Sequence, residues 1–377
     1  MKKVLFVPDS FKGTMSSQEI CDILTQELHR VWPQAAASAI PVADGGEGSV
    51  DAFLAAAGGE KIAVPCKGPY MEDIQGFYGR LPDGTAVVEM AAAAGLPLAG
   101  ERLHPDQTTT YGVGQLMLAA LRGGAKRLIV GLGGSATNDG GAGMLAALGA
   151  RFLGTDGQAY LPTGGTLDRL AQVDLSGLDP MVPSAEIIAM CDIDNPLCGP
   201  AGASAVFGPQ KGADPAMVET LDRNLAHLAD VAAAGLGRDM REAPGAGAAG
   251  GLGFAMASFL GSRLQPGIET VLDTVGFDEL LKGADLVVTG EGRIDSQSIR
   301  GKVVIGVARR AKAAGVPVSA IVGDIGDGTE AAYELGVSGI FSTNRVAVPF
   351  SQAKLRAKED MRATAANLFR FMARLGL

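Results

Sequence analysis

The sequence has few of the residues that build metal centres and disulfide frameworks. It contains four cysteines without a C-x-x-C pair, and its three histidines, His29, His104 and His227, lie far apart. This spacing offers neither a zinc site nor a disulfide framework. Cys191 and Cys198 flank an acidic turn and are in principle able to bind metal or to pair, but we expect all four cysteines to be small buried apolar residues.

Positive charge and long hydrophobic runs are also scarce. Asp and Glu number 41 against 32 Lys and Arg, which gives a formal charge of -9. Such a chain would repel the phosphates of nucleic acid and an anionic membrane surface. The first apolar run, residues 4–7, ends at Pro8-Asp9 and is far shorter than a signal-peptide core or a membrane span. We expect a cytoplasmic protein with a small-molecule substrate and leave its oligomeric state open.

Apolar residues, by contrast, are plentiful. They make up 47% of the 377 residues, and charged residues make up 19%. This composition supplies enough apolar surface to offset the chain entropy lost on folding. Compact cores stop growing beyond roughly 250 residues, so the length predicts two domains.

Predicted strands alternate with predicted helices along most of the chain. Ser16 and Glu19 have capping-box spacing at the start of a helix. Strands are expected at residues 4–7, 39–42, 128–130, 187–190, 286–289 and 318–322. Further helices are expected from Asp214-Pro215 to Gly235, over residues 302–314, and from Ser351 onward. The last of these helices carries Leu355, Met361, Leu368 and Met372 roughly at helical spacing. The alternation predicts mainly parallel sheets, whose ligands lie beyond the carboxyl ends of the strands.

The middle of the chain has a different pattern. Short apolar runs at 62–64, 75–78 and 86–90 are separated by Gly-Pro and Pro-Asp-Gly turns, which predicts antiparallel strands. We therefore predict the α/β class with two domains: a discontinuous, doubly wound, mainly parallel domain of residues 1–58 plus 284–377, and an inserted mixed-sheet domain of residues 59–283. The active site is expected in the cleft between them.

The most informative segment is GLGGSATNDGGAG at residues 131–143. It follows a predicted strand and precedes a helical run at 144–148, where bare amides and hydroxyls suit phosphate oxygens. The plainer interpretation is a tight strand-to-helix crossover. The candidate phosphate-binding residues are Gly131, Gly133, Gly134, Ser135, Thr137 and Asn138.

The same segment permits a second function. Gly131-x-Gly133-x-x-Ala136 satisfies a loose dinucleotide fingerprint, and Asp156 follows at about the spacing of a ribose-binding acid. This pattern is typical of a nicotinamide-dependent hydroxy-acid oxidoreductase, although the polar residues 137–141 stand where that fingerprint needs a helix. No Walker A loop is present, because Gly301-Lys302 is followed by Val303. A third alternative is a noncatalytic binder of small sugar acids.

Acidic turns recur at predicted strand ends, and cations lie near several of them. Phosphoryl transfer needs carboxylates for magnesium and for the hydroxyl proton, and cations for the moving phosphoryl group. Any single Asp at such a place is more often a turn former or helix cap. Arg293 and Asp295 can equally form an internal salt bridge, and Lys211 can equally be a solvated loop lysine. The acidic turns hold Asp44 and Glu47, Asp192 and Asp194, and Glu291 and Asp295, and the cations are Lys12, Lys211, Arg293 and Lys302.

Six segments together closely resemble the bacterial type-1 glycerate kinase family, in the same order and almost from end to end. They are PDSFKG at 8–13, PVADGGEG at 41–48, residues 131–143, DIDNPL at 192–197, FGPQKGA at 207–213 and TGEGRID at 289–295. The resemblance implies phosphorylation of D-glycerate with ATP and Mg2+, with 2-phosphoglycerate the favoured product, in sugar-acid and glyoxylate catabolism. It also implies one flavodoxin-like domain and one with a restriction-endonuclease-like topology.

The resemblance and the residue chemistry together suggest a role for each candidate. Residues 131–138 would hold the nucleotide phosphates. Asp192 and Asp295 would hold magnesium or serve as base, with Asp44 as the other candidate base. Lys12 and Arg293 would bind the glycerate carboxylate or the transferred phosphoryl group.

Two positions depart from the family pattern. Arg300 stands where many relatives are expected to have His, and Asn344-Arg345 is also atypical. Either departure can alter the choice of substrate.

Overall fold

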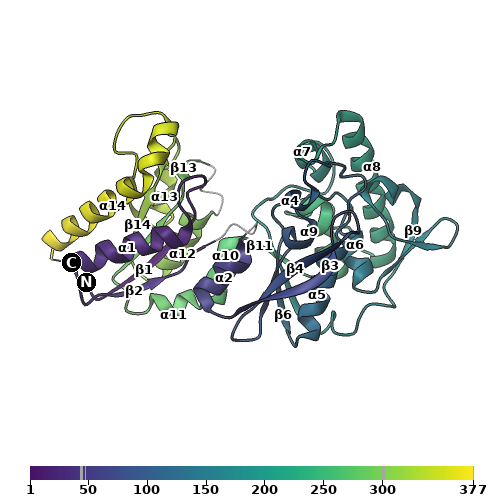
Figure 1. Ribbon diagram of the computed structural model, residues 1–377, viewed down its shortest axis with the longest axis horizontal. Helices are drawn as coiled ribbons and strands as arrows, with labels where there is room; N and C mark the ends of the chain where they lie inside the picture. The colour runs from purple at the N-terminus through teal and green to yellow at the C-terminus, as the bar shows by residue number, and fades with distance from the viewer. Residues whose placement is uncertain (43–45, 47, 297, 299–301, 377) are drawn as a thin grey trace. The chain divides into compact units, whose positions relative to one another are not determined.

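The computed structural model describes residues 1–42, 46, 48–296, 298 and 302–376, and the chain divides into two compact units (Figure 1). Unit 1 comprises Met1–Asp44, Ala55–Ala57 and Ile268–Leu377, and unit 2 comprises Gly45–Leu54 and Gly58–Gly267. Compactness alone does not show that a unit folds independently, so the domain boundaries expected from the sequence stay a prediction.

Unit 1 is built on a five-stranded parallel sheet in the order β16-β14-β12-β1-β2. Counted in chain order the strands run 2-1-3-4-5, which is the flavodoxin-like order of doubly wound folds. The expected doubly wound parallel sheet is therefore confirmed. Its strands are β1 Lys3–Pro8, β2 Ala36–Ala39, β12 Leu286–Gly290, β14 Val318–Val322 and β16 Val337–Ser342, with a small parallel pair, β13 Arg293–Ile294 and β15 Asp324–Ile325.

The second strand of unit 1 lies earlier than expected. It was predicted at residues 39–42, whereas β2 ends at Ala39. Pro41 has no N–H and cannot donate to a strand ladder, so the apolar run at 39–42 cannot continue the strand. The amides of Ile40 and Val42 still donate to Phe6 O and Pro8 O, which keeps this segment beside β1.

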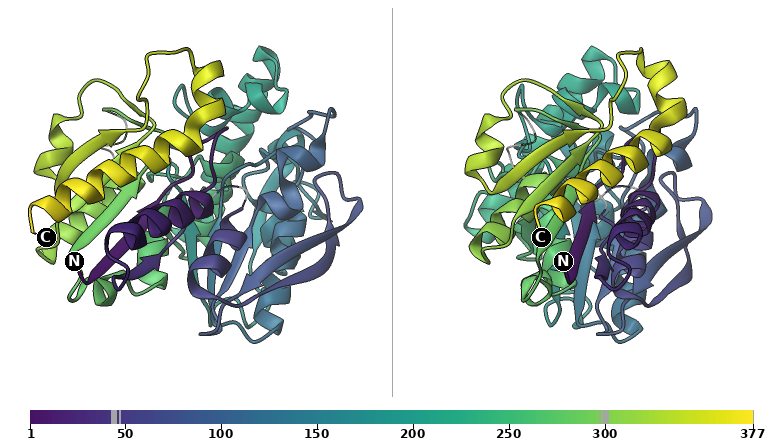
Figure 2. Two further views of the ribbon diagram at one scale, coloured as in Figure 1. Left: turned by 60° about the vertical axis from the view of Figure 1, so that its left-hand side comes forward. Right: turned by 90° about the vertical axis from the view of Figure 1, so that its left-hand side faces the viewer.

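Helices α1 and α14 lie side by side in unit 1, and both chain ends are close to them (Figure 2). The predicted capping box is confirmed: the Glu19 amide donates to Ser16 Oγ, and the Ser16 amide donates to Glu19 Oε2. Leu355 was wrongly placed on the apolar face of α14, since it is 83% exposed, whereas Met361 is buried. The helices of unit 1 are α1 Ser17–Val31, α10 Gly267–Thr274, α11 Phe277–Leu281, α12 Val303–Ala313, α13 Glu330–Glu334 and α14 Phe350–Arg374.

Unit 2 is built on a six-stranded mixed sheet in the order β11-β10-β6-β5-β4-β3. Strands β3, β4 and β5 pair antiparallel, as expected, and β5, β6, β10 and β11 pair parallel. The strands are β3 Glu60–Lys67, β4 Asp73–Arg80, β5 Ala86–Glu89, β6 Arg127–Gly131, β10 Glu186–Met190 and β11 Arg263–Gln265, with a second sheet of β7 Arg151–Gly154, β8 Ala159–Tyr160 and β9 Leu170–Asp174.

Most helices of unit 2 are short. The exception is α8, where Asp214 caps the N-terminus as predicted by accepting from the Met217 amide. Its end lies at the left-handed Gly237 and not at Gly235. The helices are α2 Ser49–Ala57, α3 Ala91–Ala94, α4 Leu96–Ala99, α5 Tyr111–Arg122, α6 Ala142–Ala147, α7 Ala203–Phe207, α8 Pro215–Leu236 and α9 Ala248–Phe259, with 3-10 turns η1 Gly164–Arg169 and η2 Pro209–Lys211.

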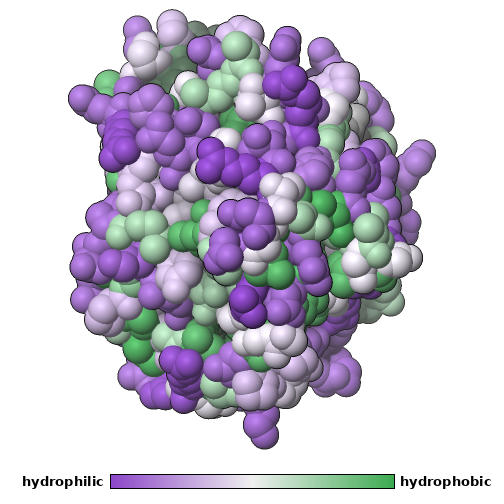
Figure 3. Space-filling view, turned by 90° about the vertical axis from the view of Figure 1, so that its right-hand side faces the viewer, coloured by the Kyte–Doolittle hydropathy of each residue, from purple (hydrophilic) through white to green (hydrophobic). Residues whose placement is uncertain are grey.

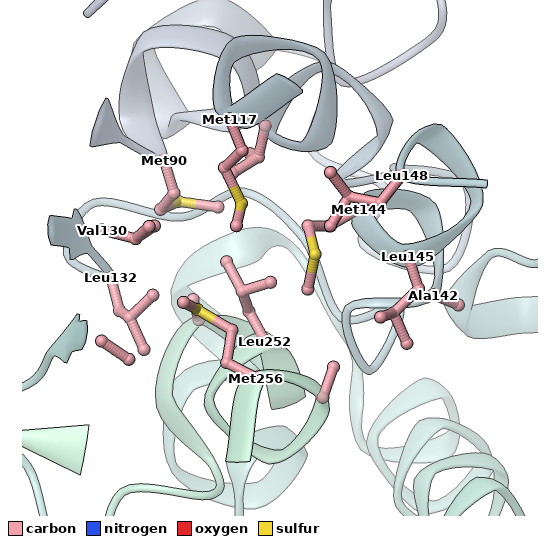
Figure 4. Close-up of a cluster of buried hydrophobic side chains, with 14 of the residues drawn as sticks. Met90, Met117, Val130, Leu132, Ala142, Met144, Leu145, Leu148, Leu252 and Met256 are labelled. Carbon is pink, nitrogen blue, oxygen red and sulfur yellow. The ribbon is translucent and has the colours of Figure 1, made fainter. Parts of the chain in front are cut away.

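The core of unit 2 lies directly beneath the glycine-rich segment. Figure 4 shows Met90, Met117, Met144, Leu252 and Met256 pointing toward one another; Met90 directly follows β5, and the others come from α5, α6 and α9. Methionine adapts to irregular gaps, so it suits the junction of several short helices. This packing fixes the start of α6 and thereby the loop that precedes it.

The surface shown in Figure 3 is mainly hydrophilic, with hydrophobic residues in small scattered groups. Within the described ranges, every helix is too short or too polar to cross a bilayer.

Candidate active site

In unit 1, two of the predicted segments meet at the carboxyl ends of β1 and β12. These neighbouring strands form the point where the strand order reverses, and ligands of such sheets bind beyond it. Asp9 and Lys12 follow β1, and Glu291, Arg293 and Asp295 follow β12. The sheet therefore brings the PDSFKG and TGEGRID segments to one edge.

The β1 loop and the β12 loop lie beside each other at Gly292. A Cβ at Gly292 would lie 3.6 Å from Phe11 Cα and 3.8 Å from the Lys12 nitrogen. The β1 loop is closed by hydrogen bonds from the Phe11 amide to Met15 O and from the Thr14 amide to Phe11 O. Lys12 is thus carried on a defined turn against the β12 loop.

The internal ion pair considered for Arg293 is present. Arg293 Nε lies 3.7 Å from Asp295 Oδ2, and the Arg293 side chain is still 62% exposed. A loose, exposed pair contributes little to stability. Arg293 therefore keeps donors that face solvent and are able to bind an anion.

Glu291 is the least expected group at this edge. Its side chain is 5% exposed, and its Oε1 has no hydrogen-bond partner in the part of the chain that the structure describes. Burial raises the pKa of Glu291 to about 7, against the opposing effects of Ser298 and Lys302. The sequence indicated only an acidic turn here, because burial of one carboxylate cannot be read from the Gly-Glu-Gly pattern.

Glu291 should make the free energy of unfolding depend on pH. Its pKa is about 7 in the folded chain against an ordinary 4.5, so between these values the folded state holds a proton that the unfolded state has lost. Stability contributed by this group is complete below pH 4.5 and is lost as the pH rises through 7. As the pH rises from 5 to 7, we expect the free energy of unfolding of E291Q to increase by about 2 kcal/mol relative to that of the parent. Urea unfolding of both proteins across this range measures the difference, and a constant difference would contradict the assignment.

In unit 2, three parallel strand ends meet at one edge. Glu89 ends β5, the glycine-rich loop follows β6, and Asp192 follows β10. Glu89 Oε1 accepts from the Val50 amide at 2.5 Å and its Oε2 accepts from the Gly48 amide at 3.3 Å, so this carboxylate caps helix α2. Burial raises the pKa of Glu89. No motif marked Glu89, because its role depends on a partner about forty residues away.

Asp139 is the anchor of the glycine-rich loop. Fully buried, it accepts hydrogen bonds from the amides of Thr110, Gly141 and Gly143 at 2.7, 3.0 and 3.1 Å. The hydroxyls of Thr110 and Thr109 also donate to it, at 2.8 and 3.4 Å. Burial raises the pKa of Asp139, and these donors oppose that shift. One carboxylate thereby fixes the loop to the start of α6.

Lys211 holds the other side of the loop. Its ammonium donates to Ser135 Oγ and to Thr137 O, both at 2.7 Å, and the residue is 2% exposed. The interpretation as a solvated loop lysine is therefore wrong. The turn η2 carries Lys211 inward, because Gly212 adopts φ 96° and packs against Leu103 O. Burial lowers the pKa of Lys211 to about 7, and the negative Asp139 opposes this.

The titration of Lys211 should appear as a second pH effect of opposite sign. An unfolded lysine keeps its proton to about pH 10.5, whereas the folded state loses it near 7. Between these values the unfolded state binds more protons, so the free energy of unfolding contributed by this group rises with pH. As the pH rises from 7 to 9, we expect the free energy of unfolding of the parent to increase by about 2 kcal/mol relative to that of K211M. The exposed Lys282, changed to Met, is the control; equal pH slopes for K211M and parent would refute the shift.

The loop offers its backbone at one place and is buried elsewhere. Gly134 is exposed and Gly133 half-buried, and among the described residues the structure records no hydrogen bond from their amides. Thr137 and Asn138 are buried, and Thr137 Oγ1 and Asn138 Oδ1 have no partner in the described residues. The exposed amides at Gly133 and Gly134 are thus the part of the loop best placed to meet a phosphate.

The loop is backed by a strained segment that the sequence analysis did not single out. Ala249, Gly250 and Gly251 at the start of α9 have φ of 52°, 66° and 92°. A Cβ at Gly250 would lie 2.0 Å from Thr137 O, so only glycine permits this approach. The Gly-Ala-rich run at 245–253 was the available sequence signal.

Asp192 lies exposed at the end of β10, where its Oδ1 accepts from the Gly267 amide at 2.7 Å. A Cβ at Gly267 would lie 3.2 Å from Asp192 Oδ2, so glycine leaves the carboxylate room. The hydrogen bond from the Gly267 amide thus holds the Asp192 carboxylate in position at the end of β10.

Three positions named in the sequence analysis are not described. Asp44, the alternative base, Glu47 of the same acidic turn, and Arg300, the expected departure from the family pattern, lie outside the described residues. Among the residues that are described, no cluster of three or more Asp, Glu, His or Cys is placed to hold a metal ion. Asp192 belongs to unit 2 and Asp295 to unit 1.

The four cysteines are free thiols, but the expectation that they are buried holds for only two of them. Cys21 and Cys66 are buried, and Cys191 and Cys198 are half-buried. Burial raises the pKa of Cys191 to about 11 and that of Cys198 to about 12. Burial thus disfavours the thiolate, which is the form of cysteine that binds metal.

The dinucleotide interpretation of the loop does not fit this topology. In a dinucleotide fold the strand after the first helix joins the same parallel sheet. Here β7, which follows α6, pairs instead with β8 and β9 in a separate sheet. Asp156 Oδ1 accepts from the Gln158 amide in the turn between β7 and β8. It is a turn former.

Comparison with known proteins gives consistent matches over the full chain. A family model described as the glycerate kinase family matches residues 4–373. A glycerate kinase of Bacillus subtilis (strain 168) is 47% identical over 368 residues, 97% of this chain and 96% of that protein. A glycerate 2-kinase of Escherichia coli (strain K12) is 46% identical over 342 residues, 90% of each chain. A crystal structure described as a glycerate kinase 2 from Salmonella typhimurium LT2 has a TM-score of 0.88 and 42% identity, and the match covers 100% of both chains. The similarity thus includes both compact units.

Proposed function

This chain belongs to the glycerate kinase family, phosphotransferases with an alcohol group as acceptor, and on that premise we propose that it phosphorylates D-glycerate with ATP and magnesium. The proposed product is 2-phosphoglycerate, in the catabolism of sugar acids and glyoxylate. The name of the glycerate 2-kinase of Escherichia coli, 46% identical, supports this choice of hydroxyl. We also propose that the enzyme works in the cytoplasm.

The observation that carries the proposal is the construction of the glycine-rich loop. Asp139 and Lys211 fix it from two sides, while Gly133 and Gly134 present open amides. Amides held in this way bind phosphate oxygens without reorganising, which stabilises charge as it develops. The loop thereby supplies what a Walker A segment supplies elsewhere.

The reaction assigns roles to the carboxylates and cations. The glycerate hydroxyl oxygen forms a bond to the γ-phosphorus as the bond from that phosphorus to the oxygen of departing ADP breaks. Asp192, with Asp44 as the alternative, accepts the hydroxyl proton. Lys12 and Arg293 bind the glycerate carboxylate or the transferred phosphoryl group.

The donor set fits magnesium. Asp192 and Asp295 offer exposed or half-exposed carboxylate oxygens, and Mg2+ commonly takes one or two carboxylates and completes its shell with water and phosphate. When bound, the ion neutralises charge on the phosphates.

The test mixes purified protein with ATP, magnesium and D-glycerate, follows ADP, and identifies the product by NMR. Glycerate-dependent ADP together with 2-phosphoglycerate supports the proposal. Formation of 3-phosphoglycerate would change the hydroxyl and keep the reaction class. No ADP from a folded protein with a range of sugar acids would refute ATP as the donor.

A further inference from the structure

Unit 1 contains a pocket to which the proposed roles assign no ligand, although Lys12, one of its lining residues, has a proposed role. Its volume is 310 Å³, and its described walls come from the carboxyl ends of β1, β12, β14 and β16 and from the first turns of α14. They include Phe11, Lys12, Thr343, Asn344, Phe350 and Ala357. The pocket thus lies at the end of the parallel sheet where ligands of doubly wound folds bind.

The size of the pocket points away from the acceptor substrate. Sites for drug-sized ligands begin at about 300 Å³, and a three-carbon acid would leave most of this one empty. A nucleoside, with a fused ring and a sugar, is of the appropriate size. The pocket is therefore built for the larger of the two substrates.

Its lining is unusually apolar for an exposed surface. Phe350 is 65% exposed and Val346 is 41% exposed, and both line the pocket together with Val348 and Ala353. Exposed large apolar side chains in one concave place indicate a ligand that covers them. An aromatic ring at such a place offers a surface on which a planar base can stack.

The polar groups of the pocket fit the remaining parts of a nucleotide. Asp324 and Asn344 offer acceptors and donors for the edge of a base, and Lys12 and Lys354 offer positive charge for phosphates. The other carboxylate of the lining, Asp360, is buried and held by Arg356, with Nε to Oδ2 at 2.7 Å and an N–H to Oδ1 at 2.9 Å. This pairing neutralises Asp360, so it does not repel an anion.

We propose that this pocket binds the purine nucleoside of the phosphoryl donor. The inference rests on the proposed function in one respect, the identity of the donor as a nucleotide. It assigns the nucleoside to a pocket whose described walls all belong to unit 1.

The experiment fills the pocket and measures nucleotide binding directly. The test variant is A353W, because Ala353 is a small residue of α14 that lines the pocket. The matched control is L355W, because Leu355 is 83% exposed and lies outside the lining. Calorimetry gives the Kd for ADP, and steady-state assays give KM for D-glycerate and Ki for inorganic tripolyphosphate. We expect A353W to raise the Kd for ADP about tenfold to a hundredfold. The KM for D-glycerate and the Ki for tripolyphosphate should change by no more than about twofold. All three constants of L355W should equal those of the parent.

The outcomes separate this inference from the proposed function. If A353W binds ADP as tightly as the parent, or if only its KM for D-glycerate rises, the nucleoside subsite is overturned while ATP-dependent activity stays in place. Weaker ADP binding by A353W in a protein that forms no phosphoglycerate would support the subsite and refute the reaction. A parent that does not bind ADP overturns the inference. If A353W does not fold, F350A removes the stacking ring without adding bulk and is expected to weaken ADP about tenfold.

Discussion

The substitution D192N is expected to lower kcat at least about a hundredfold, with little change in the free energy of unfolding. Oδ1 of Asn can still accept from the Gly267 amide, which lies 2.7 Å from Asp192 Oδ1, so the side chain should keep its place. What Asn lacks is the ability to take a proton, and general base catalysis contributes about 10²–10⁴ in rate. Steady-state kinetics of D192N with saturating substrates measures the effect.

The control for D192N is D194N, because Asp194 is an exposed acid in the same turn with no role in the mechanism. Both variants should unfold at the same urea concentration as the parent. A D192N enzyme with nearly normal kcat would remove Asp192 from proton transfer, and D44N would then be the decisive variant.

Loss of the Asp139 carboxylate is expected to have the largest effect on stability. In D139A the buried amides of Thr110, Gly141 and Gly143 lose their acceptor, and each unsatisfied buried donor costs about 1–3 kcal/mol. Because the loop can relax and admit water, we expect a total loss of about 3–5 kcal/mol rather than the full sum. Chemical denaturation measures it.

The matched control for D139A is D156A. Asp156 also accepts an amide hydrogen bond, from Gln158, but it does so on an exposed turn. Loss of this hydrogen bond in D156A should lower the free energy of unfolding by about 1 kcal/mol or less. A D139A protein as stable as D156A would show that Asp139 does not organise the loop.

The fold was predictable wherever local chemistry decides the structure. The strand at residues 4–7 and the Ser16–Glu19 capping box depend on neighbours within a few residues, and both were found in the right place. The shift of β2 and the exposure of Leu355 show the limit. An apolar run predicts burial, but it does not reveal what the rest of the chain leaves uncovered.

The candidate site was predictable as segments and not as contacts. The glycine-rich loop, Lys12 and Asp192 all lie at the carboxyl ends of parallel strands, as the alternation of strands and helices indicated. Lys211 was seen as a cation, yet its burial against Ser135 and Thr137 depends on pairs more than seventy residues apart. Glu89 and the backing glycine Gly250 were missed for the same reason, since their roles exist only when distant segments meet.

The order of the strands in unit 1 also bears on how the protein is made. Strand β1, which is synthesised well before β12, lies between β2 and β12, and the pairing with β12 joins Val4 to Leu286. The sheet of unit 1 therefore cannot be completed until the last third of the chain has been synthesised, whereas all the strands of unit 2 are available earlier. During that interval β1 and the apolar face of α1 lack part of the core that they later join, and exposed apolar surface of this kind favours aggregation.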